Sequence, residues 1–381
     1  MNIGIAGPIT PSQIAGALGV RAPGLPIGMG GTAVTSLVIG LARAGHSVVV
    51  YSLSPDVTSH TTRQVGSVRF HFGPYRERAR DRAADFFRAE RAALAGFVRA
   101  DPVDVVNAHW TYEFALGALE ARADTVITVR DWAPLILKMQ PTAYRLVRMM
   151  MNRRCLQKAH TLTCTSPYMR EMLLHSGQNA SLTPNMVSSA AFMRAPRVER
   201  SGSTVVCVSN GYAGWKNVGS LVKAMPYLAD SELLLVGHEL DPGGPAEAES
   251  RRLGVQDRVR CLGSLEYADV LGVIASADVL VHPSIEESFG NVLVEAMALG
   301  VPVVGGRRSG AVPWVLDEGE AGVLVDIRSP RLIAEAVSRL LDDAETWSHF
   351  SQAGRVNVET RFSEYAVTEA YLSVYRQVLG G

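Results

Sequence analysis

Short runs rich in valine, isoleucine and leucine alternate with longer segments of helical periodicity along the chain. This alternation is typical of parallel sheets whose strands are connected through helices. The sequence therefore predicts an α/β fold. We expect strands at residues 2–6, 47–52, 67–72, 103–108, 125–129, 161–164, 204–208, 232–236, 258–262, 278–282, 301–304 and 322–325. We expect helices near residues 32–44, 76–99, 112–121, 135–159, 217–228, 265–275, 290–299, 329–342 and 363–378.

The length of the chain indicates two cores. Its 381 residues are too many for one ordinary core and fit about two domains of typical size. A stretch without periodicity, residues 187–203, contains the serine, proline and glycine of a linker. We therefore expect two doubly wound, Rossmann-like domains that face each other across a cleft, residues 1–188 and residues 189–360. Ligands of such sheets bind outside the carboxyl ends of the strands.

The charge balance and the absence of targeting signals argue against a nucleic-acid-binding, secreted or membrane-spanning protein. The chain has 37 Lys plus Arg and 37 Asp plus Glu, so no net field draws it to nucleic acid. It begins without a signal-peptide pattern, and no uncharged apolar run is long enough to span a bilayer, so we expect it in the cytosol. The basic and apolar segment Arg145–Arg154 either packs on the sheet with its arginines in solvent, which the pattern favours, or lies on an anionic membrane surface. The four cysteines lack metal or redox spacing and are expected to be reduced.

The most informative segment follows the strand that ends at His282, a residue we interpret as structural. A loop with two acids leads into a helix that Ser288 or Asn291 is placed to cap. Gly290 lets a ligand approach the backbone closely, and the free amides of a helix start favour an anion such as a diphosphate. Glu295, one turn into the helix, is placed to accept hydrogen bonds from ribose hydroxyls, and Glu287 to meet a sugar beyond the phosphates. The alternative is that both acids are solvated near a helix start.

In full, this segment resembles the Glu-x7-Glu signature of glycosyltransferase family 4, the retaining enzymes of the GT-B fold. Its two acids, Glu287 and Glu295, stand seven residues apart within Pro-Ser-x-x-Glu-Ser-Phe-Gly and Glu-Ala-Met-Ala-x-Gly-x-Pro-Val-Val. The resemblance continues through residues 305–313, 319–325, 30–31, 41–48, 104–110 and 183–187. The end of the chain, 361–381, resembles the terminal helix that in this family crosses back to the N-terminal domain.

The resemblance implies roles for particular residues. Glu295 would bind the ribose and Glu287 the donor sugar, with Lys216 on the diphosphate and His109 near the reacting centre. Taken alone, His109 is better explained as a polar core residue. The implied donor-binding residues are Gly30, Gly31, Lys216, Ser288, Phe289, Gly290, Asn291 and Glu295.

Two positions depart from the family pattern. The family often has an arginine in Gly-Arg-Leu before the lysine, and residues 209–217 contain none, so Arg307 or Arg308 is left as a substitute. The usual His-Asp pair is Arg130-Asp131 here. Both are candidates for acceptor or donor contact, although Asp131 is equally placed to cap the helix near Pro134.

The sequence thus predicts a retaining hexosyltransferase that moves a sugar from a nucleoside diphosphate sugar to an acceptor hydroxyl, in glycan, glycolipid or glycoside biosynthesis. The expected acceptor is a saccharide, a lipid-linked molecule or a small molecule, and no separate cofactor is expected. The chain has no Asp-x-Asp, no metal-ligand cluster and no P-loop, so transfer should need no metal.

Three other functions stay open. They are a GT-B-like nucleotide-sugar epimerase, a non-catalytic nucleotide-sugar-binding protein and a nicotinamide oxidoreductase. The last would need Gly-x-Gly-x-x-Gly directly after the first strand. The glycines Gly28, Gly30 and Gly31 have another spacing and end a long connection far from that strand, as functional or mobile loops do.

Overall fold

The computed structural model describes residues 1–192 and 203–380, which form two compact units. The first unit is Met1–Met186 together with the segment from Glu364 onwards, and the second is Val187–Ser363. Most of the expected linker, 187–203, lies outside the described residues, because only its ends fall within them.

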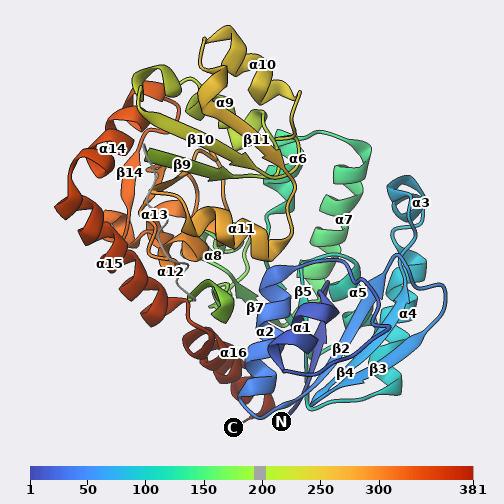
Figure 1. The fold of residues 1–381 in the computed structure, drawn as a ribbon. Coiled ribbons are helices and arrows are strands. Elements are labelled where there is room, and N and C mark those ends of the chain that lie inside the picture. Colours follow the sequence, from blue (N-terminus) through green and yellow to red (C-terminus); the bar gives the residue numbers. More distant parts are fainter. Residues whose placement is uncertain (193–202, 381) are drawn as a thin grey trace. The chain divides into compact units, whose positions relative to one another are not determined.

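The first unit is built around one sheet (Figure 1). Its order is β3-β4-β2-β1-β5-β6-β7-β8, with every pairing parallel except that of β3 with β4. The strands are β1 (Asn2–Ala6), β2 (Ser47–Ser54), β3 (Thr61–Val65), β4 (Val68–Pro74), β5 (Val105–His109), β6 (Val126–Val129), β7 (Thr161–Cys164) and β8 (Ser181–Leu182). The helices are α1 (Pro11–Ala17), α2 (Thr32–Arg43), α3 (Ala79–Ala84), α4 (Arg88–Ala100), α5 (Glu113–Ala121), α6 (Ala133–Met139), α7 (Ala143–Lys158), α8 (Pro167–His175) and α16 (Glu364–Leu379).

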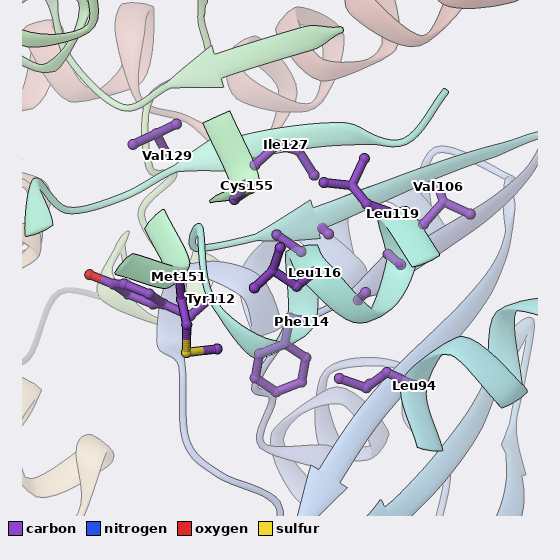
Figure 2. Close-up of a cluster of buried hydrophobic side chains, with 14 of the residues drawn as sticks. Leu94, Val106, Tyr112, Phe114, Leu116, Leu119, Ile127, Val129, Met151 and Cys155 are labelled. Carbon is purple, nitrogen blue, oxygen red and sulfur yellow. The ribbon is translucent and has the colours of Figure 1, made fainter. Parts of the chain in front are cut away.

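Apolar side chains cover both faces of this sheet, as expected for strands that are apolar throughout. On one face α4, α5 and α7 share an apolar cluster with the sheet, which includes Leu94, Leu116 and Met151 from the helices and Val106 and Ile127 from the strands (Figure 2). On the other face α1, α2 and α16 pack on β1, β2 and β4. The end of the chain thereby completes the core of the first unit.

The second unit has a parallel sheet in the order β11-β10-β9-β12-β13-β14. Its strands are β9 (Ser203–Val208), β10 (Ser231–Val236), β11 (Val259–Gly263), β12 (Val279–His282), β13 (Val303–Gly306) and β14 (Val323–Val325). Its α-helices are α9 (Val218–Val222), α10 (Pro245–Arg252), α11 (Tyr267–Ala275), α12 (Asn291–Ala298), α13 (Val312–Val315), α14 (Pro330–Asp342) and α15 (Ala344–Arg361). Short 3₁₀ turns are η1 (Ser189–Phe192), η2 (Gly214–Lys216), η3 (Met225–Tyr227), η4 (Gln256–Arg258) and η5 (Asp317–Gly319).

Both sheets are doubly wound, as the sequence predicts, and each has a point where the strand order reverses. In the first unit the chain moves outward from β1 through β2 to β4 and then returns to β5 on the other side of β1. In the second it moves from β9 through β10 to β11 and returns to β12. Ligands of such sheets bind at the carboxyl ends of the two strands that flank the reversal. A binding site is therefore expected at the loops that follow β1, β5, β9 and β12.

Several expected elements differ in the structure. The helix expected at 76–99 is divided into α3 and α4, because Phe86 and Phe87 adopt positive φ values of 55° and 59°. The helix expected at 135–159 is divided into α6 and α7 before Pro141, as the restriction on residues preceding proline favours. The helix expected at 217–228 stops at Val222. The exposed edge strand β3 is antiparallel and lacks the apolar pattern that identifies a buried strand.

Candidate active site

In the second unit the turn after β9 carries Lys216. Gly211, Gly214 and Asn217 all have positive φ, which brings the chain sharply back toward the sheet. The Asn217 side chain donates to the carbonyl oxygens of Pro283 (3.1 Å) and Ile327 (2.9 Å), which lie in the loops after β12 and β14. These bonds hold the lysine turn against the carboxyl edge of the sheet, at the reversal of strand order.

Lys216 and Glu287 form an ion pair at this edge. The lysine Nζ lies 3.3 Å from Glu287 Oε2, and His282 Nε2 lies 3.2 Å from the same oxygen. Burial raises the pKa of Glu287, but the hydrogen bond from His282 and the charge of Lys216 outweigh it and bring the pKa to about 2. Glu287 is therefore an anion at neutral pH, with a cation directly beside it.

The start of α12 follows this pair. Its N-cap is Gly290, with φ at 89°, and an added Cβ would lie 2.8 Å from Leu293 Cδ1. The N-cap position is held by Gly290, between the two expected candidates Ser288 and Asn291, and a glycine has no side chain with which to cap the helix. The Phe289 ring is buried against Trp314 and Phe362, which leaves its backbone as the part available to a ligand. The first backbone amides of α12 thus follow a glycine N-cap that lies three residues after Glu287.

Glu295 differs from Glu287 in its surroundings. It is buried on α12, and its Oε1 accepts a hydrogen bond from the hydroxyl of Tyr267 on α11 at 3.2 Å. Burial raises the pKa of Glu295 to about 7, and the bond from Tyr267 opposes this rise only in part. The carboxyl is therefore close to half-protonated at neutral pH.

In the first unit His109 ends β5, next to the reversal of strand order. It is fully buried, and its Nδ1 accepts from the guanidinium of Arg130, with Nε at 3.1 Å. Arg130 also donates to Asn185 and to the hydroxyl of Tyr371 on α16. An added Cβ at Gly7, after β1, would lie 3.4 Å from His109 Cδ2. The histidine is thus fixed between the ends of β1, β5 and β6.

The Arg130 contact determines the protonation of His109. Because Nδ1 accepts from the guanidinium, the ring proton is on Nε2, which has no hydrogen-bond partner among the described residues. Burial and the neighbouring positive charge of Arg130 hold the pKa of His109 well below its usual value. This histidine is a neutral N–H donor and is unsuited to act as a cationic acid.

Asp131 has a different partner from the one the sequence suggests. The N-cap of α6 is Trp132, so the expected cap by Asp131 is wrong. Its Oδ1 instead accepts from the Tyr112 hydroxyl at 2.8 Å, and burial raises the pKa of Asp131. The Tyr112 ring also stacks on Arg148 of α7, which pairs with Glu113. The contacts of Arg148 with Tyr112 and Glu113 therefore lie inside the first unit.

The glycines before α2 have separate roles. Gly31 is the N-cap of α2 with φ at 90°, and a Cβ there would lie 2.4 Å from the carbonyl oxygen of Pro8. A Cβ at Gly30 would meet nothing within 4 Å. Gly31 is thus required by the close approach to the loop after β1, whereas the backbone at Gly30 borders open space.

The structure groups the sequence candidates by unit. Lys216, Glu287 and His282 are in contact in the second unit, and His109 contacts Arg130 in the first. The turn before Lys216 contains no arginine, and its Tyr212 donates its hydroxyl to Glu249 at 3.0 Å. Arg307 and Arg308 line a cavity after β13 rather than contacting Lys216.

Sequence reasoning missed three contributors to these groups. His282 carries a recognisable signal, because it ends a strand five residues before Glu287. Asn185 lies in a Pro-Asn turn that the family resemblance already includes. Tyr371 has no local signal, since it contacts Arg130 from 241 residues away.

Metal ligands, thiols and membrane-spanning helices are the remaining features of the described residues. In the stretches 1–192 and 203–380, no group of three or more His, Cys, Asp or Glu side chains is arranged to hold a metal ion. All four cysteines are free, and burial raises the pKa of the Cys207 thiol to about 12. Within those same stretches no helix is both long enough and apolar enough to cross a membrane.

Comparison with known families decides the class. Residues 30–190 match the family described as Glycosyltransferase Family 4, and residues 202–343 match Glycosyl transferases group 1. The chain is a family 4-like glycosyltransferase. This glycosyltransferase is 23% identical to N-acetyl-alpha-D-glucosaminyl L-malate synthase of Bacillus anthracis, over 92% of the chain and 95% of that enzyme. It is 39% identical to D-inositol 3-phosphate glycosyltransferase of Corynebacterium diphtheriae, over 35% of the chain and 33% of that enzyme.

Solved structures show the same fold. Sucrose-phosphate synthase from Thermosynechococcus elongatus superimposes with a TM-score of 0.76 at 20% identity, covering 100% of the glycosyltransferase and 99% of that chain. The Anabaena protein HepE, solved with UDP and glucose, gives a TM-score of 0.68 at 16% identity, covering 99% and 100%. These structures confirm the GT-B fold, and the family matches and named relatives confirm the assignment to the hexosyltransferases.

Proposed function

We propose that this glycosyltransferase moves a sugar from a nucleoside diphosphate sugar to an acceptor hydroxyl, with retention of the anomeric configuration and without a metal. The observation that carries the proposal is the pairing of Lys216 with Glu287 beside the start of α12, whose N-cap is Gly290. A cation, a carboxylate and the N-terminus of a helix at a reversal of strand order match the phosphates and hydroxyls of such a donor.

The cation and the helix start would serve the leaving group. In the transfer the bond from the anomeric carbon to the phosphate oxygen breaks, and negative charge develops on the diphosphate. Lys216 and the first amides of α12 are the groups available to stabilise that charge. When the donor binds, Lys216 would exchange Glu287 for phosphate, and Glu287 would exchange Lys216 for sugar hydroxyls.

The remaining groups would orient the substrates. Glu295 would accept from ribose hydroxyls, and the Nε2–H of His109 would donate to a substrate hydroxyl. We propose attack from the face that the diphosphate leaves, with the acceptor oxygen bonding to the anomeric carbon and its proton passing to the departing phosphate. Glu287 is held by Lys216 and His282, which suits it to binding better than to nucleophilic attack.

The acceptor is proposed from the names of relatives. Those names include an N-acetyl-alpha-D-glucosaminyl L-malate synthase, a D-inositol 3-phosphate glycosyltransferase and a phosphatidylinositol monomannoside mannosyltransferase. They support a small or lipid-linked hydroxyl acceptor, in keeping with glycoside, glycan or glycolipid synthesis.

Calorimetry with nucleoside diphosphates and their sugars tests the donor assignment. A ligand at a hundred times its Kd stabilises the fold by about 2.7 kcal/mol. The rise in melting temperature with each nucleoside diphosphate therefore identifies the preferred nucleotide base before the calorimetry. Transfer to a panel of hydroxyl acceptors is then measured with and without excess EDTA. We expect one nucleotide series to bind and transfer to persist in EDTA. Loss of transfer that manganese or magnesium restores would contradict the metal-free mechanism.

We also propose peripheral membrane contact from the cytosolic side through α6 and α7. The segment 132–170 contains no Asp or Glu, and α7 exposes Leu146 and Met150 to about half. A basic segment with exposed apolar side chains favours binding to the surface of an anionic membrane. Arg153→Glu with Arg154→Glu should abolish flotation with vesicles of anionic phospholipid. Equal flotation of the wild type with zwitterionic vesicles would argue against the charge-based contact.

A further inference from the structure

A cationic cavity lies on the second unit, after β13 and β14. Its volume is about 210 Å³, and its lining includes Arg307, Arg308 and Arg328 together with Ser309 and Asp326. Pockets for drug-sized ligands usually measure about 300–1,000 Å³, whereas one water occupies about 30 Å³. The cavity is thus too small for a nucleotide sugar and large enough for a small anion.

The arginines of this cavity are not neutralised by the protein. Within the described part of the chain, none of the three forms an ion pair with a carboxylate, although Arg307 donates to the carbonyl oxygen of Leu324 at 3.0 Å. The one acid in the lining, Asp326, accepts from the backbone N–H of Arg328 at 3.1 Å, within its own turn. By contrast Arg331, on the neighbouring first turn of α14, pairs with Glu335 at 2.9 Å.

The backbone around the cavity is tightly constrained. A Cβ at Gly306 would lie 1.9 Å from Ser309 Oγ, and one at Gly310 would lie 2.3 Å from the carbonyl oxygen of Glu287. Ala311 N donates to that same carbonyl at 2.9 Å. The turn that carries Arg307 and Arg308 is therefore packed against the Glu287 loop, which limits the positions its arginines can take.

We propose that this cavity binds a phosphoryl dianion, as free phosphate or as the phosphate of a phosphomonoester, at a site separate from the donor diphosphate site. Guanidinium groups match phosphate oxygens by paired hydrogen bonds, and a dianion offsets the mutual repulsion of three nearby arginines. The start of α14, directly after Arg328, adds favourable helix-dipole charge. The inference does not depend on the proposed transfer reaction, because Lys216 is not part of the lining.

Calorimetry with inorganic phosphate and with glycerol 3-phosphate, against sodium chloride of equal ionic strength, tests this site. Arg308→Gln and Arg328→Gln should each weaken phosphate binding about tenfold or more, because each removes charge-assisted hydrogen bonds. Arg331→Gln is the matched control and should bind as the wild type does. Tighter binding of glycerol 3-phosphate than of phosphate would identify a phosphomonoester as the ligand, and the reverse would identify free phosphate.

Two results would overturn the proposal. One is the absence of binding beyond the chloride control for both probes. The other is phosphate binding that Lys216→Ala abolishes while Arg308→Gln and Arg328→Gln leave it intact, since the anion would then occupy the diphosphate site. Single variants of exposed arginines are used throughout, and their circular dichroism spectra establish that each is folded.

Discussion

Two glutamates of one short segment have opposite electrostatics. Glu287 is beside a lysine and a histidine, and its pKa is about 2, whereas Glu295 faces a tyrosine hydroxyl in a buried place and has a pKa of about 7. The difference arises from their partners, since both side chains are shielded from solvent. It follows that the two acids should respond differently to substitution, to ligand and to pH.

Substitution by alanine should separate their roles. Glu295→Ala should weaken bare nucleoside diphosphate and full donor alike, by about ten- to a hundredfold, because both carry the ribose. Glu287→Ala should leave bare nucleotide binding unchanged or tighter, since Lys216 loses its competing carboxylate, and should lower donor affinity or turnover. Calorimetry with both ligands and initial rates measure this, with exposed Glu335→Ala as control. Equal loss of bare nucleotide binding in both variants would refute the proposed order of ribose, diphosphate and sugar.

The raised pKa of Glu295 predicts a pH-dependent stability. Its folded pKa of about 7 exceeds the ordinary value of 4.5, so the wild type loses stability as pH rises from about 4.5 through about 7. Glu295→Gln avoids this loss and should gain on the order of 2–3 kcal/mol relative to wild type between pH 5 and pH 8. Glu287→Gln is the internal control, because its stabilising contribution is lost only below about pH 4.5 and stays constant in that range. The free energies of unfolding of the variants and the wild type are measured by denaturant titration at pH 5 and pH 8. A difference between Glu295→Gln and wild type that is the same at both pH values would contradict the prediction.

At the scale of elements, sequence pattern predicts what is local and buried. The apolar strands of both sheets and the helix start at Gly290 follow from the sequence, because each depends on neighbours in the chain. The break at Phe87 was missed because a buried aromatic at positive φ overrides helical periodicity, whereas the break before Pro141 carries a local signal in the proline itself. Arg130 illustrates the limit for the site, as its partners Asn185 and Tyr371 come from distant segments that no spacing connects.

Helix α16 contributes to a core more than two hundred residues away in sequence, which gives a stability prediction. The buried hydroxyl of Tyr375 donates to Asn107 Oδ1 on β5 at 2.9 Å. Tyr375→Phe leaves that buried acceptor with less hydrogen bonding and should lower the free energy of unfolding by about 1–2 kcal/mol. Tyr365→Phe, at a side chain 78% exposed on the same helix, should change little. Urea denaturation of both variants provides the measurement, and equal stabilities would mean that the α16 contact contributes nothing.

Over the whole molecule, each unit presents its own chemistry at its own reversal of strand order. The second unit offers charge for a diphosphate, with Lys216 and the start of α12. The first offers the neutral donor His109. At the second edge Glu287 is paired with Lys216, and Glu295 accepts a hydrogen bond from Tyr267. This division favours a transfer that depends on leaving-group stabilisation over one that forms a covalent enzyme intermediate.

The stereochemistry of the product tests that conclusion on the intact enzyme. If the acceptor attacks from the face that the diphosphate leaves, the new bond has the configuration of the donor, and the departing phosphate takes the proton. Proton NMR of the product, recorded early enough to precede any isomerisation, should therefore show the donor's anomeric configuration. A parallel reaction of Glu287→Ala should give the same anomer at a lower rate, because the acid is proposed to bind the sugar and not to attack it. An inverted product from the wild type would rule out the retaining mechanism, and a changed anomer from the variant would assign Glu287 to the chemical step.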